Sequence, residues 1–170
     1  MKTTILKFFT LSAAIFAFST ISFGQDTSTG TVNASANIIT PISIVKVTGI
    51  NFGDLVPSLT TAVNVVMGQT GTITSDAQYF LANSPRTAAS FTITGAAGHT
   101  YKINCPATIA LEGPGDDMTL TFDASLAING TSLTLTDGTQ TLNLGGSLAL
   151  AANQTAGAYR ATFDVTVAYE

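Results

Sequence analysis

The C-terminal stretch 157–170, GAYRATFDVTVAYE, alternates apolar and polar residues along its whole length. Alternation with a period of two is typical of a β-strand that buries one face and exposes the other. We therefore predict a strand that runs to the last residue. Its inward residues are Tyr159, Ala161, Phe163, Val165, Val167 and Tyr169.

Shorter alternating segments precede this stretch, separated by turn sequences such as GQTG, GAAGH, LEGPGDD and LGGS. Glycine, proline, asparagine and aspartate in such clusters favour turns between strands. No window after residue 24 keeps the apolar repeat of a helix, so almost no helix is expected. The expected strands are 31–38, 42–47, 62–67, 89–94, 101–105, 118–122, 133–135, 142–144 and 148–150.

The spacing of these strands predicts an all-β fold, an immunoglobulin-like antiparallel β-sandwich, with a barrel as the alternative. The abundant threonine and other β-branched residues suit a pleated, half-buried surface. We expect one domain over 31–170, after a flexible polar leader at 25–30. The expected structural residues before the last strand are Phe52, Gly53, Phe91 and Tyr101.

The N-terminus has the pattern of a secretory signal peptide over residues 1–24. Lys2 and Lys7 precede an apolar run, 8–21, and small residues end at Gly24, where cleavage is expected. The alternative is an uncleaved anchor, but the run is shorter than the roughly 20 residues that a spanning helix needs. The prediction is export to the periplasm, the cell surface or the medium, with no membrane span after signal removal.

Charge argues against some partners. Without Lys2 and Lys7, the chain keeps four basic residues against ten acidic ones, and the basic residues are scattered. Nucleic acids and anionic membranes require clustered positive charge. A single cysteine also allows no intramolecular disulfide.

Few residues offer chemistry. His99 lies in a turn without a nucleophile motif, so we interpret it as an exposed turn residue. Cys105 falls on an inward position and is interpreted as a buried free thiol. Glu112, Asp116 and Asp117 could hold calcium, but their spacing fits no known loop and Gly-Pro-Gly explains a turn. We expect no catalytic residue, no metal and no cofactor.

Four stretches together resemble a secreted bacterial family of unknown function, numbered 4402: NFG, ASFTITGAAGHTYKINCP, MTLTF and LNLGGSLALAANQTAGAYRATFDVTVAYE. The most specific part is the block from Gly145 to Tyr169. The family usually has leucine or a similar residue where Cys105 stands, which argues against a shared thiol function.

The same order of features resembles, more distantly, spore coat protein U and fimbrial subunits. They share an alternating N-terminal segment, an early Phe-Gly, and a Gly-x-Tyr before the last strand, here Gly157 and Tyr159. The resemblance implies an incomplete sandwich that a neighbour's N-terminal extension completes. Tyr159 also resembles a corner tyrosine whose hydroxyl bonds back to the backbone.

Three functions compete. The first is a pilin-like structural or adhesive subunit that assembles with copies of itself by strand addition through 31–38, with Val32, Ala34, Ala36 and Ile38 in the groove. The second is a monomer, in which 31–38 pairs inside its own domain and the surface binds a protein or a glycan. Tyr79 with Phe80 is the exposed aromatic candidate for a glycan. The third is an enzyme, for which one histidine and scattered carboxylates give little support.

Overall fold

The structure, a computed structural model, describes residues 26–170; the predicted signal peptide and its cleavage point lie outside these residues. The described chain divides into residues 26–37 and a compact unit, Ile38–Glu170. We expected the domain to begin at residue 31 with a strand over 31–38. Residues 26–42 instead have no assigned secondary structure, because no strand of the described chain pairs with them.

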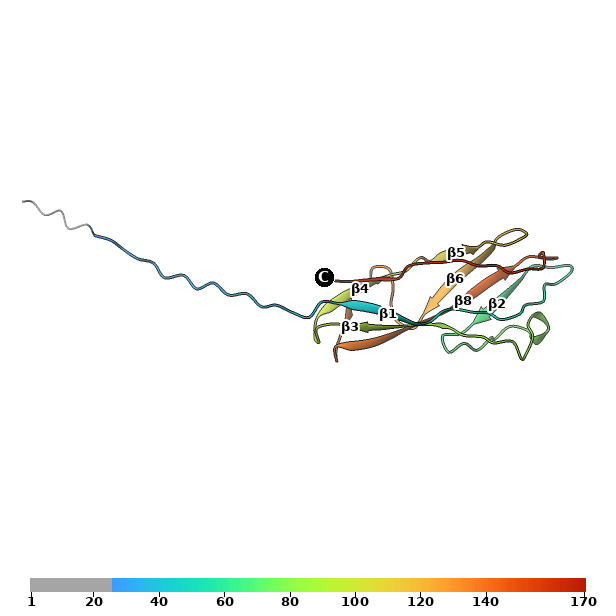
Figure 1. Cartoon of the computed structure of the whole chain (residues 1–170), viewed down its shortest axis with the longest axis horizontal. Coiled ribbons are helices and arrows are strands. Elements are labelled where there is room, and N and C mark those ends of the chain that lie inside the picture. The colour runs from blue at the N-terminus through green and yellow to red at the C-terminus, as the bar shows by residue number, and fades with distance from the viewer. Residues whose placement is uncertain (1–25) are drawn as a thin grey trace, which may run out of the picture. The chain divides into compact units, whose positions relative to one another are not determined.

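One sheet of the compact unit has six antiparallel strands in the order β1-β3-β8-β6-β5, and β2 also pairs with β8 (Figure 1). The strands are β1 (Ser43–Thr48), β2 (Val63–Met67), β3 (Ala89–Thr94), β5 (Thr108–Leu111), β6 (Met118–Ala124) and β8 (Thr139–Leu150).

The second sheet has three strands in the order β7-β4-β9. They are β7 (Leu133–Thr134), β4 (Thr100–Asn104) and β9 (Thr166–Tyr169), and both pairings are antiparallel. Within residues 26–170 the only helical element is a 3₁₀ turn, Ala77–Tyr79. The predicted all-β antiparallel fold is therefore confirmed. No helix in this part of the chain is long and apolar enough to cross a membrane.

Strand β8 is the centre of the large sheet. Its first half pairs with β3, and its second half pairs with β2 on one side and β6 on the other. The turn that we expected at LGGS is wrong, because Gly145 and Gly146 continue the strand. A side chain at Gly145 would meet the backbone of Met67, and one at Gly146 the backbone of Thr121. The two glycines thus allow close approach of the neighbouring strands.

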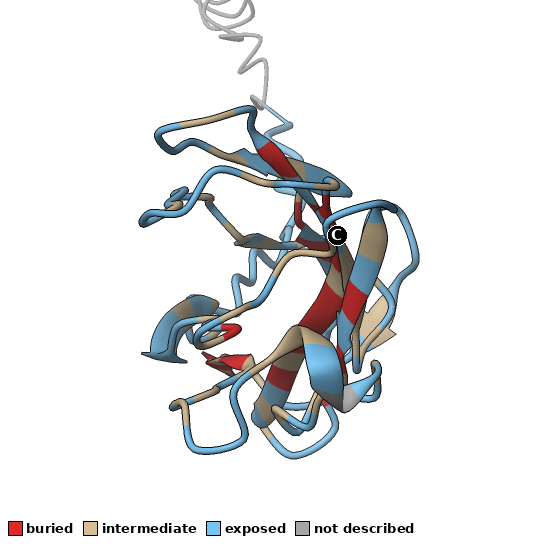
Figure 2. Ribbon diagram, turned by 90° about the vertical axis from the view of Figure 1, so that its right-hand side faces the viewer, coloured by how far each residue is buried: buried red, intermediate tan, exposed pale blue. Residues whose placement is uncertain are grey.

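Two clusters of buried side chains form the core. The buried residues are red on the ribbon in Figure 2. The first lies between the two sheets and comprises Ala89, Phe91, Ile93, Tyr101, Ile103, Cys105, Leu135, Leu142 and Leu144. The second belongs to the other half of the large sheet and comprises Phe52, Val65, Met67, Met118, Leu120, Leu148 and Leu150.

The terminal strand is shorter than its sequence predicts. Only Thr166–Tyr169 pairs with β4, and Arg160 makes an isolated bridge with Glu112. Residues 161–165 pair with nothing in the described chain. The reason lies on the neighbouring segment: β4 ends before Cys105-Pro106, proline has no amide to donate, and β5 pairs with β6 instead.

Candidate functional site

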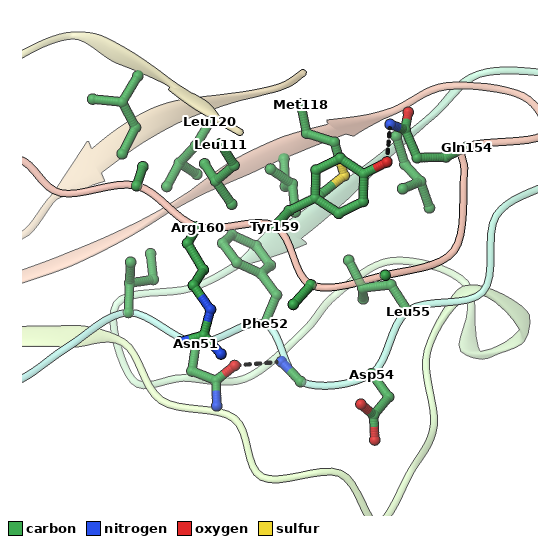
Figure 3. A pocket seen from close by; sticks show the side chains of 18 of the residues that line it. Asn51, Phe52, Asp54, Leu55, Leu111, Met118, Leu120, Gln154, Tyr159 and Arg160 are labelled. Atoms are coloured by element: carbon green, nitrogen blue, oxygen red, sulfur yellow. Dashed lines mark hydrogen bonds between the residues drawn. The ribbon is translucent and has the colours of Figure 1, made fainter. Parts of the chain in front are cut away.

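A groove opens in the compact unit where the terminal strand loses its partners (Figure 3). It has a volume of about 860 Å³ and lies between two chain segments, 50–57 and 154–163. We call this space the open groove and the two segments its first and second rim. The side chains of Ile109, Leu111, Met118, Leu120, Leu148 and Leu150 form its floor.

The first rim is bonded on one side only. The amide and carbonyl of Asn51 bond to Thr87, the amide of Val56 bonds to Tyr79, and the carbonyl of Asp54 bonds to Leu81. Phe52 and Leu55 lie next to these residues, and their backbone groups have no hydrogen-bond partner within residues 26–170. The segment is not one continuous strand, because Gly53 has a φ of 75° and Asp54 lies in a bend. Phe52 and Leu55 both line the open groove, and their backbone groups are unpaired in this part of the chain.

The second rim is also hydrogen-bonded on one side only. Arg160 and Thr166 direct their amides and carbonyls away from the groove, to Glu112 and Asn104. By alternation the backbone groups of Ala161, Phe163 and Val165 face the opposite side. They have no partner in the part of the chain that the structure describes. Both rims thus present unpaired strand edges to the same space.

The floor is apolar and belongs to the core itself. Leu120 pairs with Leu148 across β6 and β8, and Leu111 pairs with Met118 across β5 and β6. Figure 3 shows Leu111, Met118 and Leu120 on one side of the groove, with Phe52 on the other. An apolar floor between two edges with unpaired backbone groups suits an extended peptide, whose backbone bonds to the edges and whose alternate side chains reach the floor.

Tyr159 lies near the middle of the second rim. Its hydroxyl donates to the carbonyl of Thr155 at 2.9 Å and accepts from Nε2 of Gln154. Its ring packs where a side chain on Gly113 would lie. Gly157 has a φ of 153°, which favours glycine. This is the geometry of a corner tyrosine, and it ties the middle of the second rim back to its first residues, Gln154 and Thr155.

The segment with the predicted strand-exchange residues is exposed. Every residue from 26 to 38 is exposed, and Val32 and Ile38 reach 89% and 96% exposure. Exposed large apolar side chains that alternate with polar ones have the pattern of a strand without its sheet. The structure does not bring Val32, Ala34, Ala36 or Ile38 into its core.

The other predicted structural residues lie where a core or a turn needs them. Gly53 has a φ of 75°, and a side chain there would meet Ser84. The hydroxyl of Tyr169 donates to the carbonyl of Thr40 and accepts the amide of Ala96. Phe52, Phe91 and Tyr101 are buried, and Phe163, Val165, Val167 and Tyr169 are half-buried.

The two residues considered for catalysis stand apart. His99 is exposed, and its Nδ1 lies 3.1 Å from the carbonyl of Ala97. Cys105 is a buried free cysteine, and burial raises the pKa of its thiol. A raised pKa lowers the thiolate fraction, which is the reactive form.

The acidic loop and the aromatic pair offer less than the sequence suggested. Among residues 26–170 no three histidines, cysteines or carboxylates gather closely enough to hold a metal ion. Tyr79 packs against the second core cluster, and the guanidinium of Arg86 lies 4.7 Å from the ring centroid of Phe80. Both aromatic rings are half-buried, so the expectation of an exposed aromatic pair is wrong.

Sequence reasoning predicted a groove with the terminal strand as one wall, but it did not predict the other rim or the floor. It predicted one continuous terminal strand, because alternation reports which side chains turn inward and not whether the backbone has a partner. The available signal was Pro106, which interrupts the strand that would otherwise pair with residues 161–165.

The model of one protein family, described as "Domain of unknown function (DUF4402)", matches residues 42–169. The match covers most of the chain, so the protein belongs to this family. It begins after the exposed N-terminal segment and includes both rims of the open groove. A comparison with curated proteins finds no match.

Proposed function

We propose that this family member is an exported structural or adhesive subunit of the cell surface, of pilin-like type. It assembles by β-strand addition: residues 31–38 of one copy enter the open groove of another. Export rests on the N-terminal sequence, with its basic start, apolar run and small residues before Gln25.

One observation carries the proposal: the open groove is bounded on both sides by strand edges with unpaired backbone groups. On one side these are Phe52 and Leu55, and on the other Ala161 and Phe163. Unpaired backbone groups next to an apolar floor are costly unless water or another chain satisfies them. An inserted strand would bond to both edges and exclude water from the floor.

The N-terminal segment has the properties of the missing strand. Its apolar residues alternate with polar ones over 31–38, and its residues are exposed. Eight residues in a strand span about 26 Å at roughly 3.3 Å per residue. The first rim, 50–57, has the same number of residues, but its bend at Gly53 and Asp54 makes it shorter than an extended strand.

The proposal predicts that charge on the inward face of residues 31–38 abolishes assembly. The test variant of the full chain carries Ala34→Asp and Ala36→Asp, and the control carries Asn33→Asp and Ser35→Asp. Both variants add the same charge to the same exposed segment. The test variant places it on the apolar face and the control on the polar face. Light scattering over a concentration series should show oligomers for the wild type and the control, and a monomer for the test variant.

Two results would contradict the proposal. One is a wild-type chain that stays monomeric at every concentration, which would favour the self-complete monomer. The other is equal assembly of the two variants, since assembly would then not depend on which face of the segment carries charge. Unchanged circular dichroism spectra show that both variants keep the domain intact.

A further inference from the structure

We infer that Lys46 keeps the edge strand β1 from pairing with β1 of a second copy of the chain. This edge is separate from the open groove, because no residue of β1 lines the groove. Lys46 therefore limits the contacts that two copies can make with each other, whatever enters the groove.

The strand β1 lies at one end of the large sheet (Figure 1). It pairs with β3 on one side, and no strand of the described chain pairs with its other side. In an antiparallel strand, successive residues direct their amides and carbonyls to opposite sides. Some backbone groups of Ser43–Thr48 are therefore free to pair with a strand of another molecule.

The sequence of β1, SIVKVT, favours such pairing. Three of its six residues are valine or isoleucine, and it contains no glycine or proline. Val45 and Val47 are 62% and 61% exposed. A short segment with high β-propensity, little charge and no proline is typical of strands that add to one another. An unprotected sheet edge of this composition is a site of aggregation.

Lys46 carries the one charge of β1, and the sequence has no other charge between Asp26 and Asp54. Its register partner on β3 is Phe91, which is buried in the first core cluster. Ile44, two residues earlier on β1, packs against the same cluster. Side chains two residues apart on a strand share a face, so Lys46 takes an inward position at the sheet edge. It is nevertheless exposed there.

An inward lysine is compatible with a free edge but not with a paired one. At the free edge its ammonium group reaches water. A strand added beside β1 would cover this position, and the ammonium group would lose water without gaining a partner. In an antiparallel pair of two β1 strands, the two Lys46 side chains would also approach each other, because each lies near the middle of its strand. Like charges on paired strands are destabilising.

An irregularity in β1 acts in the same direction. The register of β1 against β3 shifts between Lys46 and Thr48, and Val47 has no register partner on β3. A bulge of this kind bends the strand and increases its twist, so a regular ladder with a further strand is harder to form. An inward charge and a bulge are two of the features that protect edge strands, and β1 has both.

Replacement of Lys46 by valine tests this role. All variants are made in the full chain that also carries Ala34→Asp and Ala36→Asp, so that the proposed strand addition does not contribute. The control is Lys102→Val, which removes the same charge from β4, a strand with partners on both sides. A second control, Lys46→Arg, keeps the charge at the edge. Sedimentation velocity over a concentration series measures association, and hydrogen exchange locates the interface.

We expect Lys46→Val to form several-fold more dimer than the parent chain, Lys102→Val or Lys46→Arg at equal concentration. The amides of Ser43–Thr48 should exchange more slowly in this dimer than in the parent. If circular dichroism shows that the valine variant does not fold, Lys46→Thr, which is polar and also β-branched, should give the same result.

Two results would overturn the role of Lys46. One is an uncharged Lys46 variant that associates no more than Lys102→Val does. The other is a dimer in which exchange slows only outside β1, since the interface would then lie elsewhere. Neither result bears on the proposed strand addition, which depends on residues 31–38 and the open groove.

Discussion

The two halves of the compact unit contain similar side chains but differ in whether their backbone groups are paired. In the closed half, β4 and β9 cover the first core cluster, and the terminal strand forms a regular ladder from Thr166 to Tyr169. In the open half, the second cluster lies under the open groove. Residues 161–165 have no backbone partner in the described chain, although Phe163 and Val165 still pack against the first cluster. One alternating sequence is therefore paired from Thr166 to Tyr169 and unpaired from 161 to 165.

The difference shows that apolar alternation and strand pairing are separate requirements. Phe163 and Val165 turn inward as regularly as Val167 and Tyr169 do. Their backbone lacks a ladder because the neighbouring chain leaves at Pro106. A half-finished core of this kind is stable only if the closed half supports it, or if another strand fills the space.

The largest effect should come from truncation in the closed half. Leu142 is fully buried in β8 between the two sheets. We expect Leu142→Ala to lower the free energy of unfolding by about 2–5 kcal/mol, because it leaves a cavity in a sealed core. Urea denaturation of the monomeric Ala34→Asp/Ala36→Asp variant, with and without Leu142→Ala, measures this. If Leu142→Ala lowers the free energy of unfolding less than Leu111→Ala does, the distinction between a closed and an open half is wrong.

A smaller effect is expected from truncation in the open half. Leu111 is half-buried and borders the open groove. In the same monomeric variant, Leu111→Ala should cost about 1 kcal/mol, because it removes some burial without creating a sealed cavity. In the assembled wild type the cost should rise towards that of Leu142→Ala, since an inserted strand covers the site. Equal costs in the two forms would indicate that nothing enters the groove beside Leu111.

The smallest effect concerns the ion pair at the end of the terminal strand. The hydrogen bond from Lys102, at 2.6 Å, is the main cause that lowers the pKa of Glu170 from 4.5, and Ser132 adds to it. A lowered pKa in the folded state contributes stability above pH 4.5, and this contribution is lost as the pH falls through the lowered value.

Thermal unfolding of wild type and Glu170→Gln should therefore differ slightly at neutral pH and converge in acid. The difference should shrink in high salt, because exposed ion pairs are screened. Asp137→Asn, a neutralisation at another exposed carboxylate, is the matched control. A difference that persists in acid would assign the effect to something other than this carboxylate.

Most of the fold could be predicted from the alternation of apolar and polar residues alone. The segments around Phe91 and Tyr101 form strands almost where alternation placed them. For Gly145-Gly146 the sequence suggested both a turn and a close strand contact. The turn is wrong, and the glycine pair lets three strands approach one another. A groove beside the terminal strand was predicted, but its other rim, 50–57, and its floor could not be, because they depend on which backbone edges meet in space.

The hydroxyl of Tyr169 gives the molecule a mechanical junction. It joins the start of the compact unit at Thr40 to the turn at Ala96, while β9 holds the same ring through its ladder with β4. A pull on the N-terminal segment therefore reaches the end of β9 and the turn after β3 at once. In the proposed assembly, the load passes from the closed half of one copy through its N-terminal segment to the rims of the next copy's open groove.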